Sequence, residues 1–481
     1  MAVRPVRLFQ SYAGHHIAVL GLGRSGMACA GALASAGADV VVWDDCEAQR
    51  ARGAAAGLRV RQPVWGGSSP ERLIVSPGIP HCHPEPHPVV ADALGAGVAV
   101  DNDIGLFFCA LAEACKGEDM PAVVAITGSN GKSTTAALLH HLLHMSGKRV
   151  RLVGNIGNPV MTVTEVTGDQ IIILELSSYQ CDLAQCLEPD IAVFLNFSPD
   201  HLDRHDGVAG YFAAKQRMFE GARIRAAVVG LDQPEGRVIA GGVSSRLGRD
   251  AVTGFTGTGQ VAAIQCRESH LSWRRNGQRV RIDVAGCPGL KGQHNVLNAA
   301  AVLAVLDRLG ARPEDAAGDL MSFPGLPHRS QHVGTFRGIA VINDSKATNA
   351  ASALQSLRSH PSIRWIAGGR AKEGGIGVLT DHLAGIRKAY LIGEAAEFFA
   401  QELTETSHEI CETMDRAVAA AVRDAAAGDT ILLAPAAASF DQYANFEARG
   451  DDFVARIRTC FGAGGCGTGP GQEMCGLTTG H

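Results

Sequence analysis

Residues 122–143 read AVVAITGSNGKSTTAALLHHLL, and this stretch decides the fold. An apolar run ends at Thr127, a loop of small residues follows, and helical composition begins at Lys132. In a strand–loop–helix unit of this kind, the free backbone N–H groups and the dipole at the start of the helix attract anions. The stretch therefore predicts a phosphate-binding loop inside an α/β domain.

The loop is shorter than the general phosphate-binding pattern. That pattern, G-x-x-x-x-G-K-[ST], would place its first glycine at position 126, where this chain has Ile126. The small residues between Gly128 and Gly131 still allow the N–H groups to turn inward, and Ser133 offers a hydroxyl to a phosphate-bound Mg²⁺. The sequence leaves two alternatives here: a loop of a narrower family, or an ordinary turn with a chance lysine.

Apolar strands and helices alternate along most of the chain. The run HIAVLGLG at 16–23 and the run DVVVWDD at 39–45 begin a first series, and a second series begins near residue 120. A third series follows FPGLPHRSQ at 323–331, whose proline and glycine content is typical of a linker. Alternating α and β elements predict doubly wound, mainly parallel sheets. Between about 225 and 290, short alternating runs predict a small antiparallel sheet.

We therefore predict an α/β protein of three domains. The first is a Rossmann-like domain at 1–111, the second a central domain of the P-loop ATPase type at 112–326, and the third a Rossmann-like domain at 327–460. Residues 461–481 lack apolar periodicity, and we expect them to be disordered.

Composition excludes several classes of protein. The 481 residues carry a net charge of −5 without a basic stripe, so we expect no nucleic-acid partner. No apolar stretch reaches the length of a membrane span, and we expect no membrane association. Thirteen cysteines are too dilute for a disulfide framework. With no signal peptide expected at the N-terminus, the cytoplasm is the predicted compartment, and we expect a monomer.

The stretch GLGRSG at 21–26 fits G-x-G-x-x-G after a strand, and Asp44 ends the next strand. Taken alone, this pattern favours NAD and a Rossmann oxidoreductase. It is a weak signal in a chain with 58 glycines. Any diphosphate can approach a helix N-terminus through such a turn, so the pattern leaves the ligand open.

The shortened loop T-G-[ST]-N-G-K-[ST] resembles that of the Mur ligase family and of its relative, folylpolyglutamate synthase. The resemblance extends to ILELSSYQ at 173–180, NFSPDHLDRH at 196–205 and YFAAKQRMF at 211–219. It implies ATP as a substrate and Mg²⁺, as two ions, as the cofactor. It also implies that Lys215 is carbamoylated by CO₂, which would turn a cation into an oxygen ligand beside the metal. The implied catalytic residues are Lys132, Glu175, His201 and Lys215.

The resemblance implies a set of residues for each ligand. The metal ligands are Ser133, Glu175, His201 and Lys215. The implied ATP-binding residues are Gly128, Ser129, Asn130, Gly131, Lys132, Ser133, Thr134, Asn295, Asn298, Arg329 and Asp344. In the first domain, the residues implied to hold a UDP-sugar are Arg24, Ser25, Asp44, Ser76, Pro77 and Gly78, together with Asn155 from the segment GNIG.

The C-terminal segments INDSKATN, GGRAKEGG and LLAPAAASFDQYANFEARG resemble the D-glutamate-adding branch of the family. They imply UDP-N-acetylmuramoyl-L-alanine and D-glutamate as substrates of an ADP-forming amide ligase in peptidoglycan precursor synthesis. The residues implied to surround D-glutamate are Lys346, Thr348, Lys372, Ser439 and Phe446. The segment RAK at 370–372 departs from the family's usual DGK and changes the charge near Lys372.

Three alternatives stay open at the level of sequence. A dehydrogenase would bind NAD at residues 21–26. A folylpolyglutamate synthase would share the loop but would not need the first domain. A scaffold that binds a nucleotide without catalysis would tolerate the loss of Lys215.

Overall fold

The computed structural model describes residues 5–66, 70–116, 120–200, 202–275, 278–371 and 374–462. The chain divides into two compact units, residues 1–323 and residues 324–481, and each is described by itself. The division lies in the FPGLP segment, close to the predicted boundary at residue 326. The assignment of three functional domains stays a prediction.

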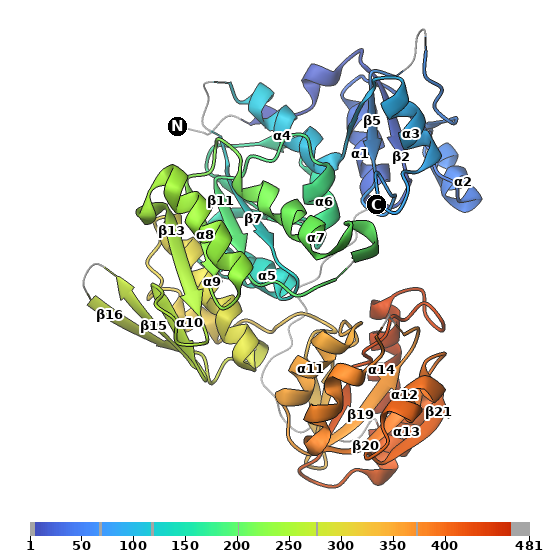
Figure 1. Ribbon diagram of the computed structural model, residues 1–481, viewed down its shortest axis with the longest axis vertical. Coiled ribbons are helices and arrows are strands. Elements are labelled where there is room, and N and C mark those ends of the chain that lie inside the picture. The colour runs from blue at the N-terminus through green and yellow to red at the C-terminus, as the bar shows by residue number, and fades with distance from the viewer. Residues whose placement is uncertain are drawn as a thin grey trace. The chain divides into compact units, whose positions relative to one another are not determined.

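The first unit begins with a five-stranded parallel sheet, shown in blue in Figure 1. Its strands, in spatial order, are β4 (Arg59–Val60), β3 (Asp39–Trp43), β2 (His16–Leu20), β5 (Arg72–Val75) and β6 (Ala99–Asp101). Its helices are α1 (Arg24–Ser35), α2 (Glu47–Ala55), α3 (Pro88–Gly95) and α4 (Asp103–Ala114). This parallel sheet agrees with the Rossmann-like prediction.

A nine-stranded sheet forms the centre of the first unit. Its strands, in spatial order, are β16 (Gln278–Asp283), β15 (His270–Arg275), β14 (Ile264–Arg267), β13 (Val252–Thr256), β12 (Ala226–Gly230), β11 (Ile191–Phe194), β7 (Ala122–Thr127), β10 (Gln170–Glu175) and β8 (Arg149–Gly154). Its helices are α5 (Lys132–Met145), α6 (Ser178–Leu183), α7 (Gly207–Gln216), α8 (Pro234–Leu247), α9 (Gln293–Arg308) and α10 (Ala317–Leu320). A short antiparallel pair, β1 (Val6–Arg7) and β9 (Glu165–Val166), lies outside this sheet.

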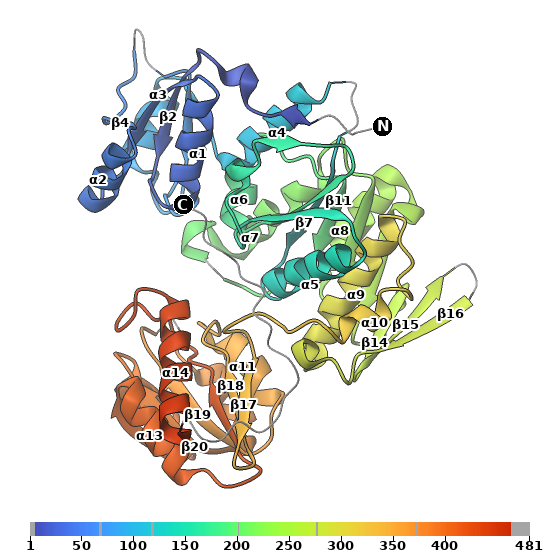
Figure 2. The ribbon, with the colours of Figure 1, turned by 180° about the vertical axis from the view of Figure 1, so that it is seen from behind.

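The central strands are apolar and buried, as strands covered on both faces must be. One face packs against α5 and α9, which lie side by side in Figure 2. The other face belongs to a core that continues into α4, α7, α8 and the first sheet.

The antiparallel prediction for residues 225–290 is confirmed only in part. Strands β14, β15 and β16 pair antiparallel, but β14 also joins β13 in parallel, so these strands extend the central sheet. Strands β12 and β13 pair in parallel with α8 between them. The local pattern of short strands did not reveal which neighbour each strand would pair with.

The second unit contains a six-stranded sheet, of which only β17 is antiparallel to its neighbour. Its strands, in spatial order, are β17 (Gln331–Phe336), β18 (Ile339–Asn343), β22 (Thr430–Leu433), β19 (Ile363–Gly368), β20 (Ile386–Ile392) and β21 (His408–Glu412). Its helices are α11 (Ala350–Arg358), α12 (Ala396–Glu402), α13 (Met414–Asp424) and α14 (Phe446–Phe461). Helices α11 and α12 cover one face, and α13 and α14 cover the other.

The predicted tail begins one residue too early. Phe461 ends α14 and is buried in the core of the second unit, where its ring stacks on Phe336. Residues 463–481 lie outside the described residues, so the rest of the tail prediction is not tested.

Seven short 3₁₀ helices occur in the described residues. They are η1 (Gln10–Tyr12), η2 (Val160–Thr162), η3 (Leu202–Arg204), η4 (Arg217–Phe219), η5 (Arg249–Ala251), η6 (Pro288–Leu290) and η7 (Gly377–Gly385). In the part of the chain that the structure describes, every helix is too short or too polar to cross a membrane.

Candidate active site

The predicted phosphate loop joins β7 to α5, as the sequence indicates. Strand β7 lies between β10 and β11, and all three run in parallel. The segments after Thr127, Glu175 and Phe194 therefore meet at one edge of the sheet, where ligands bind in open α/β folds.

Hydrogen bonds from the segment after β11 fix the loop. The Asn130 N–H donates to Asn196 Oδ1 over 2.9 Å, and Asn196 Nδ2 donates to the Asn130 carbonyl over 3.0 Å. The Ser129 hydroxyl donates to the carbonyl of Ser198 over 2.8 Å. The loop is thus preorganised by residues almost 70 positions away in the chain.

Gly131 is the turning point into α5. Its φ of +85° lies in the left-handed region, and a Cβ there would come within 2.4 Å of Asn298 Oδ1. Asn298 is buried and donates through Nδ2 to Asn295 Oδ1 over 3.0 Å. The structure therefore places Asn298 against the phosphate loop, with Asn295 bonded to it, and Gly131 is the residue that allows the contact.

Two lysines converge on one carbonyl of the loop. Lys132 Nζ donates to the Gly128 carbonyl over 2.8 Å, and Lys215 Nζ donates to the same oxygen over 3.0 Å. Lys215 is 1% exposed, and burial, followed by the charge of Lys132, lowers the pKa of its amine to about 7. Lys132 brings positive charge to this edge of the sheet, which suits a polyphosphate.

A buried carboxylate faces the same edge. Glu175 is fully buried at the end of β10, and its Oε1 accepts a hydrogen bond from Asn155 Nδ2 over 2.9 Å. Its Oε2 is buried and has no hydrogen-bond partner among the described residues. An oxygen of this kind is costly without a partner, and a cation would satisfy it.

The metal prediction is supported by part of its ligand set. Ser133 is buried in the first turn of α5, and Glu175 offers the unpartnered oxygen. His201 lies outside the described residues. Within the described ranges, no group of three or more His, Cys, Asp or Glu side chains forms a metal site. The predicted set would reach four ligands only with His201 and a modified Lys215.

The seven residues predicted to hold a UDP-sugar line one cavity of about 720 Å³ at the carboxyl end of the first sheet. They are Arg24, Ser25, Asp44, Ser76, Pro77, Gly78 and Asn155. Asp44 accepts hydrogen bonds from the N–H groups of Leu22 and Cys46, over 2.6 and 2.8 Å. Its carboxylate thus supports the glycine-rich turn.

Asn155 connects this cavity to the phosphate loop. It lines the cavity and also donates to Glu175. Arg24 makes a second connection, because its guanidinium donates to the Gly157 carbonyl in the same GNIG segment. The cavity and the edge of the central sheet that carries the predicted phosphate loop are therefore neighbours in the first unit.

In the second unit, the Lys346 side chain lies against the first residue of α14, Phe446. Its Nζ lies 3.9 Å from the centre of the Phe446 ring. The Thr348 N–H donates to the Lys346 carbonyl over 2.8 Å, and Ser439 is buried in the loop after β22. Lys372 lies outside the described residues. These residues offer a cation and N–H groups, which suit a carboxylate ligand.

Arg329 and Asp344 also lie in the second unit. Asp344 is buried, and burial raises the pKa of its carboxyl although the Ser356 hydroxyl and the Ser330 N–H donate to it. The charge of Arg329 acts on the same carboxyl in the opposite direction. Their predicted role towards ATP stays a prediction.

Sequence reasoning missed Arg449, which holds the loops of the second unit together. Arg449 is 1% exposed and donates to the Ser345 hydroxyl and carbonyl and to the Ala437 carbonyl, over 3.0, 2.9 and 3.1 Å. Burial lowers the pKa of its guanidinium to about 10. A signal was available: Arg449 falls on the apolar face of α14, with Phe453 and Ile457.

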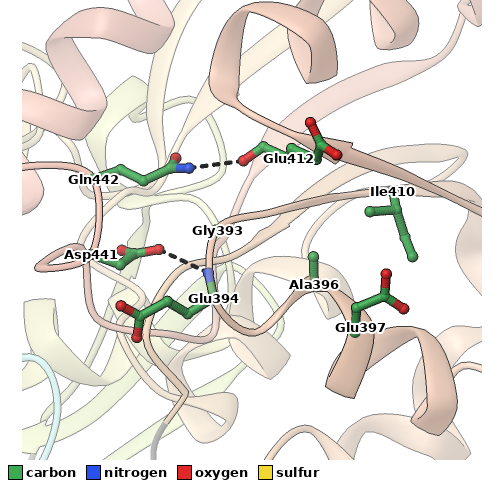
Figure 3. A pocket seen from close by; sticks show the side chains of 8 residues that line it. All are labelled: Gly393, Glu394, Ala396, Glu397, Ile410, Glu412, Asp441 and Gln442. Carbon is green, nitrogen blue, oxygen red and sulfur yellow. Dashed lines mark hydrogen bonds between the residues drawn. The ribbon is translucent and has the colours of Figure 1, made fainter.

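A hollow of the C-terminal unit, of about 300 Å³, does not suit D-glutamate (Figure 3). The side chains of Glu394, Glu397, Glu412 and Asp441 line it, and none of the residues predicted for D-glutamate does. Hydrogen bonds from Gln442 to the Glu412 carbonyl and from the Glu394 N–H to Asp441 close its rim. A dicarboxylate would meet like charge there.

Comparisons with known proteins agree with this geometry. The Mur ligase middle domain matches residues 126–306, and the Mur ligase glutamate ligase domain matches residues 328–437. The UDP-N-acetylmuramoylalanine–D-glutamate ligase of Dinoroseobacter shibae is 50% identical over 94% of this chain and 99% of its own length. The protein of the same name from Ruegeria pomeroyi is 50% identical over 93% of this chain and 98% of its own.

Solved structures show the same fold at low identity. The UDP-N-acetylmuramate-alanine ligase MurC of Thermotoga maritima gives a TM-score of 0.58 at 18% identity, covering 92% of this chain and 99% of its own. The MurF ligase of Thermotoga maritima, solved with ADP, gives 0.57 at 15% identity, covering 94% and 96%. These findings favour the ligase interpretation over a dehydrogenase. The chain belongs to the Mur ligase family.

Proposed function

We propose that the chain is an ATP-dependent amide ligase that adds D-glutamate to UDP-N-acetylmuramoyl-L-alanine in peptidoglycan precursor synthesis. The near full-length relatives at about 50% identity carry this activity in their names. One observation in the structure carries the proposal: Asn155 lines the sugar-nucleotide cavity and donates to Glu175 beside the phosphate loop. A carboxylate held at that cavity would lie next to a nucleotide held at the loop.

The reaction must activate a carboxylate before an amine can attack it. In the proposed sequence, the alanyl carboxylate attacks the γ-phosphate of ATP, giving an acyl phosphate and ADP. The amine of D-glutamate then attacks the acyl carbon, and the tetrahedral intermediate collapses and releases phosphate. A protein assists such phosphoryl transfer mainly by positioning the reactants and by neutralising developing charge.

Lys132 and the N–H groups of the loop are suited to that neutralisation. Lys132 already lies against the Gly128 carbonyl at the base of the loop. Residues 128–131, together with Ser133 and Thr134, would surround the phosphates, and the proposed site for the adenosine part includes Asn295 and Asn298. Arg329 and Asp344 belong to the same proposed set of ATP-binding residues. Mg²⁺, proposed as two ions held by Ser133, Glu175, His201 and modified Lys215, would supply further positive charge to the phosphates.

Carbamoylation of Lys215 is part of the proposal. A buried amine with a pKa near 7 is largely neutral at slightly alkaline pH, and only the neutral amine reacts with CO₂. The product would replace an amine 3.0 Å from the Gly128 carbonyl by an anion that can bind a metal. The carbamate anion would also be attracted to the Lys132 ammonium.

The amino acid would bind in the second unit. Lys346, Thr348, Lys372, Ser439 and Phe446 are proposed to hold D-glutamate, with a lysine ammonium facing its side-chain carboxylate. Action as a monomer in the cytoplasm belongs to the same proposal.

The test is ADP release from ATP, UDP-N-acetylmuramoyl-L-alanine and one amino acid at a time. We expect ADP and amide in equal amounts with D-glutamate, and little of either with L-glutamate. Amide formed without ADP, or ADP formed equally with every amino acid, would contradict the proposal. A fluorescence titration with NADH, expected to show no binding, tests the dehydrogenase alternative.

A further inference from the structure

A cluster of polar side chains lies beside the active-site edge without a role in the reaction described above. Asp182 of α6 is the centre of this cluster. Its Oδ2 lies 3.3 Å from His81 Nε2 and 3.5 Å from His205 Nδ1. His205 Nε2 in turn lies 2.8 Å from the Ser178 hydroxyl. Three separate segments of the chain therefore meet at one carboxylate.

The order Ser178, His205, Asp182 resembles a nucleophilic triad, but burial excludes that use. Ser178 and His205 are each 3% exposed, so a scissile bond could not reach the hydroxyl. The Ser178 hydroxyl lies in the first turn of α6, within a capping box formed by Ser177 and Gln180. The network is therefore structural rather than nucleophilic.

Aromatic packing holds the segment that carries His205. Its imidazole stacks on the Tyr179 ring at 5.2 Å with an interplanar angle of 14°. It also lies 5.4 Å from the Tyr211 ring. The neighbouring Arg204 places its guanidinium 4.8 Å from the centre of the Tyr179 ring. Arg204 and His205 therefore both pack against α6 through the Tyr179 ring.

This segment reaches the cavity of the first sheet. Arg204 Nη1 donates to the Gly78 carbonyl over 3.1 Å. Gly78 lines the sugar-nucleotide cavity, as do Ser76 and Pro80 on either side, and His81 follows directly. The loop at 76–81, named here the substrate loop, therefore has two attachments to the central sheet: Arg204 at Gly78 and Asp182 at His81.

Charge supports the second attachment. Burial acts to raise the pKa of the Asp182 carboxyl, but the neighbouring imidazoles of His205 and His81 hold it well below its ordinary value. The carboxylate is therefore ionised throughout the neutral range and attracts both imidazoles whenever they are protonated.

We infer that Arg204, His205 and Asp182 are positioning residues that fix the substrate loop to the central sheet, and so hold the sugar nucleotide in register with the phosphate loop. The inference rests on the proposed function, because the cavity must receive the sugar nucleotide. Arg204 and Asp182 touch the loop, and His205 packs against the residues that support them. Their loss is expected to weaken sugar-nucleotide binding and leave ATP binding intact.

The experiment compares Arg204→Ala with Arg246→Ala. Arg246 is a matched control, since its guanidinium also donates to backbone carbonyls, those of Glu220 and Gly221, but away from the substrate loop. Binding of UDP-N-acetylmuramoyl-L-alanine is measured by calorimetry, and KM values for this substrate and for ATP are measured by ADP release. Asp182→Asn is the second variant, which keeps the shape of the side chain and removes its charge.

We expect Arg204→Ala to raise both the Kd and the KM for the sugar nucleotide about tenfold, as for the loss of one hydrogen bond from a charged donor. The KM for ATP should stay within about twofold of the wild-type value. Asp182→Asn should likewise raise the Kd and KM for the sugar nucleotide and leave the KM for ATP nearly unchanged. Equal effects of Arg204→Ala and Arg246→Ala on sugar-nucleotide binding, with Asp182→Asn unchanged, would overturn the inference. If Arg204→Ala does not fold, sugar-nucleotide binding by Asp182→Asn tests the inference in its place.

The two proposals can fail separately. If the wild-type chain binds the sugar nucleotide but does not form amide, the proposed function fails, and calorimetry on the variants still tests the positioning role. If the wild type forms amide and the variants bind like the control, only the positioning role fails.

Discussion

Replacing Gly131 by alanine tests the phosphate loop at the point where it turns into α5. Gly131 has φ +85°, and an alanine Cβ would lie 2.4 Å from Asn298 Oδ1. Contacts shorter than 3.0 Å essentially do not occur for real Cβ atoms, so Asn298 must move by at least about 0.6 Å, which is 3.0 less 2.4. Asn298 is buried and hydrogen-bonded to Asn295, so this movement disturbs both asparagines.

Two costs can be separated. The left-handed conformation costs an L-residue about 1–2 kcal/mol, which lowers the free energy of unfolding. Displacing Asn298 adds the loss of a hydrogen bond at the loop, about 1 kcal/mol, and moves the N–H groups that would hold the phosphates. We expect the KM for ATP to rise about tenfold, which corresponds to about 1.4 kcal/mol.

Gly147→Ala is the matched control. Gly147 lies just beyond the other end of α5 with φ +73°, and the structure shows no described heavy atom within 4 Å of the added Cβ. It should therefore carry the conformational cost alone. Thermal unfolding measures the shared cost, and ADP release at varied ATP concentration measures the second cost. Equal KM values for ATP in the two variants would refute the assignment of this loop to the nucleotide.

Three further predictions concern other parts of the molecule. Lys215→Ala should lower turnover at least about a hundredfold, with partial recovery on adding small carboxylic acids. The exposed Lys148→Ala should stay close to wild type in the same assay of ADP release. Full activity without Lys215 would contradict its role at the metal. Asp103→Asn should stabilise the protein above pH 6. Burial raises the pKa of the Asp103 carboxyl to about 6, so between about pH 4 and 6 the folded state binds more protons than the unfolded state. The free energy of unfolding of the wild type therefore falls as the pH rises through that range. The variant should flatten that slope in thermal unfolding curves and gain about 1–3 kcal/mol at pH 7, whereas the exposed Asp92→Asn should not; an unchanged slope would count against it. Arg449→Lys should keep the charge but lose the hydrogen bonds of the guanidinium to Ser345 and Ala437. We expect the free energy of unfolding to fall by about 3 kcal/mol and the KM for D-glutamate to rise. Equal stability of this variant and of the exposed Arg458→Ala would show that these buried hydrogen bonds contribute little.

The sequence by itself determined the local structure around the phosphate loop. The apolar run before Thr127 and the helical run after Lys132 predicted β7, the loop and α5, because periodicity and glycine placement depend on neighbouring residues. The three α/β series and the family resemblance also followed from the order of motifs. The seven residues predicted for the sugar nucleotide came from that resemblance, and the structure gathers them in one cavity.

Only the tertiary structure decided which distant residues meet. Lys215 looks like a surface lysine in its own helix, yet it is buried against a carbonyl 87 positions away. The antiparallel strands β14–β16 were expected as a separate sheet, and pairing of β14 with β13 made them part of the central one. The attachments of the substrate loop to Arg204 and Asp182 carry no local signature either. Such contacts depend on how whole sheets and helices pack, because burial and partner choice are set by residues far apart in the chain.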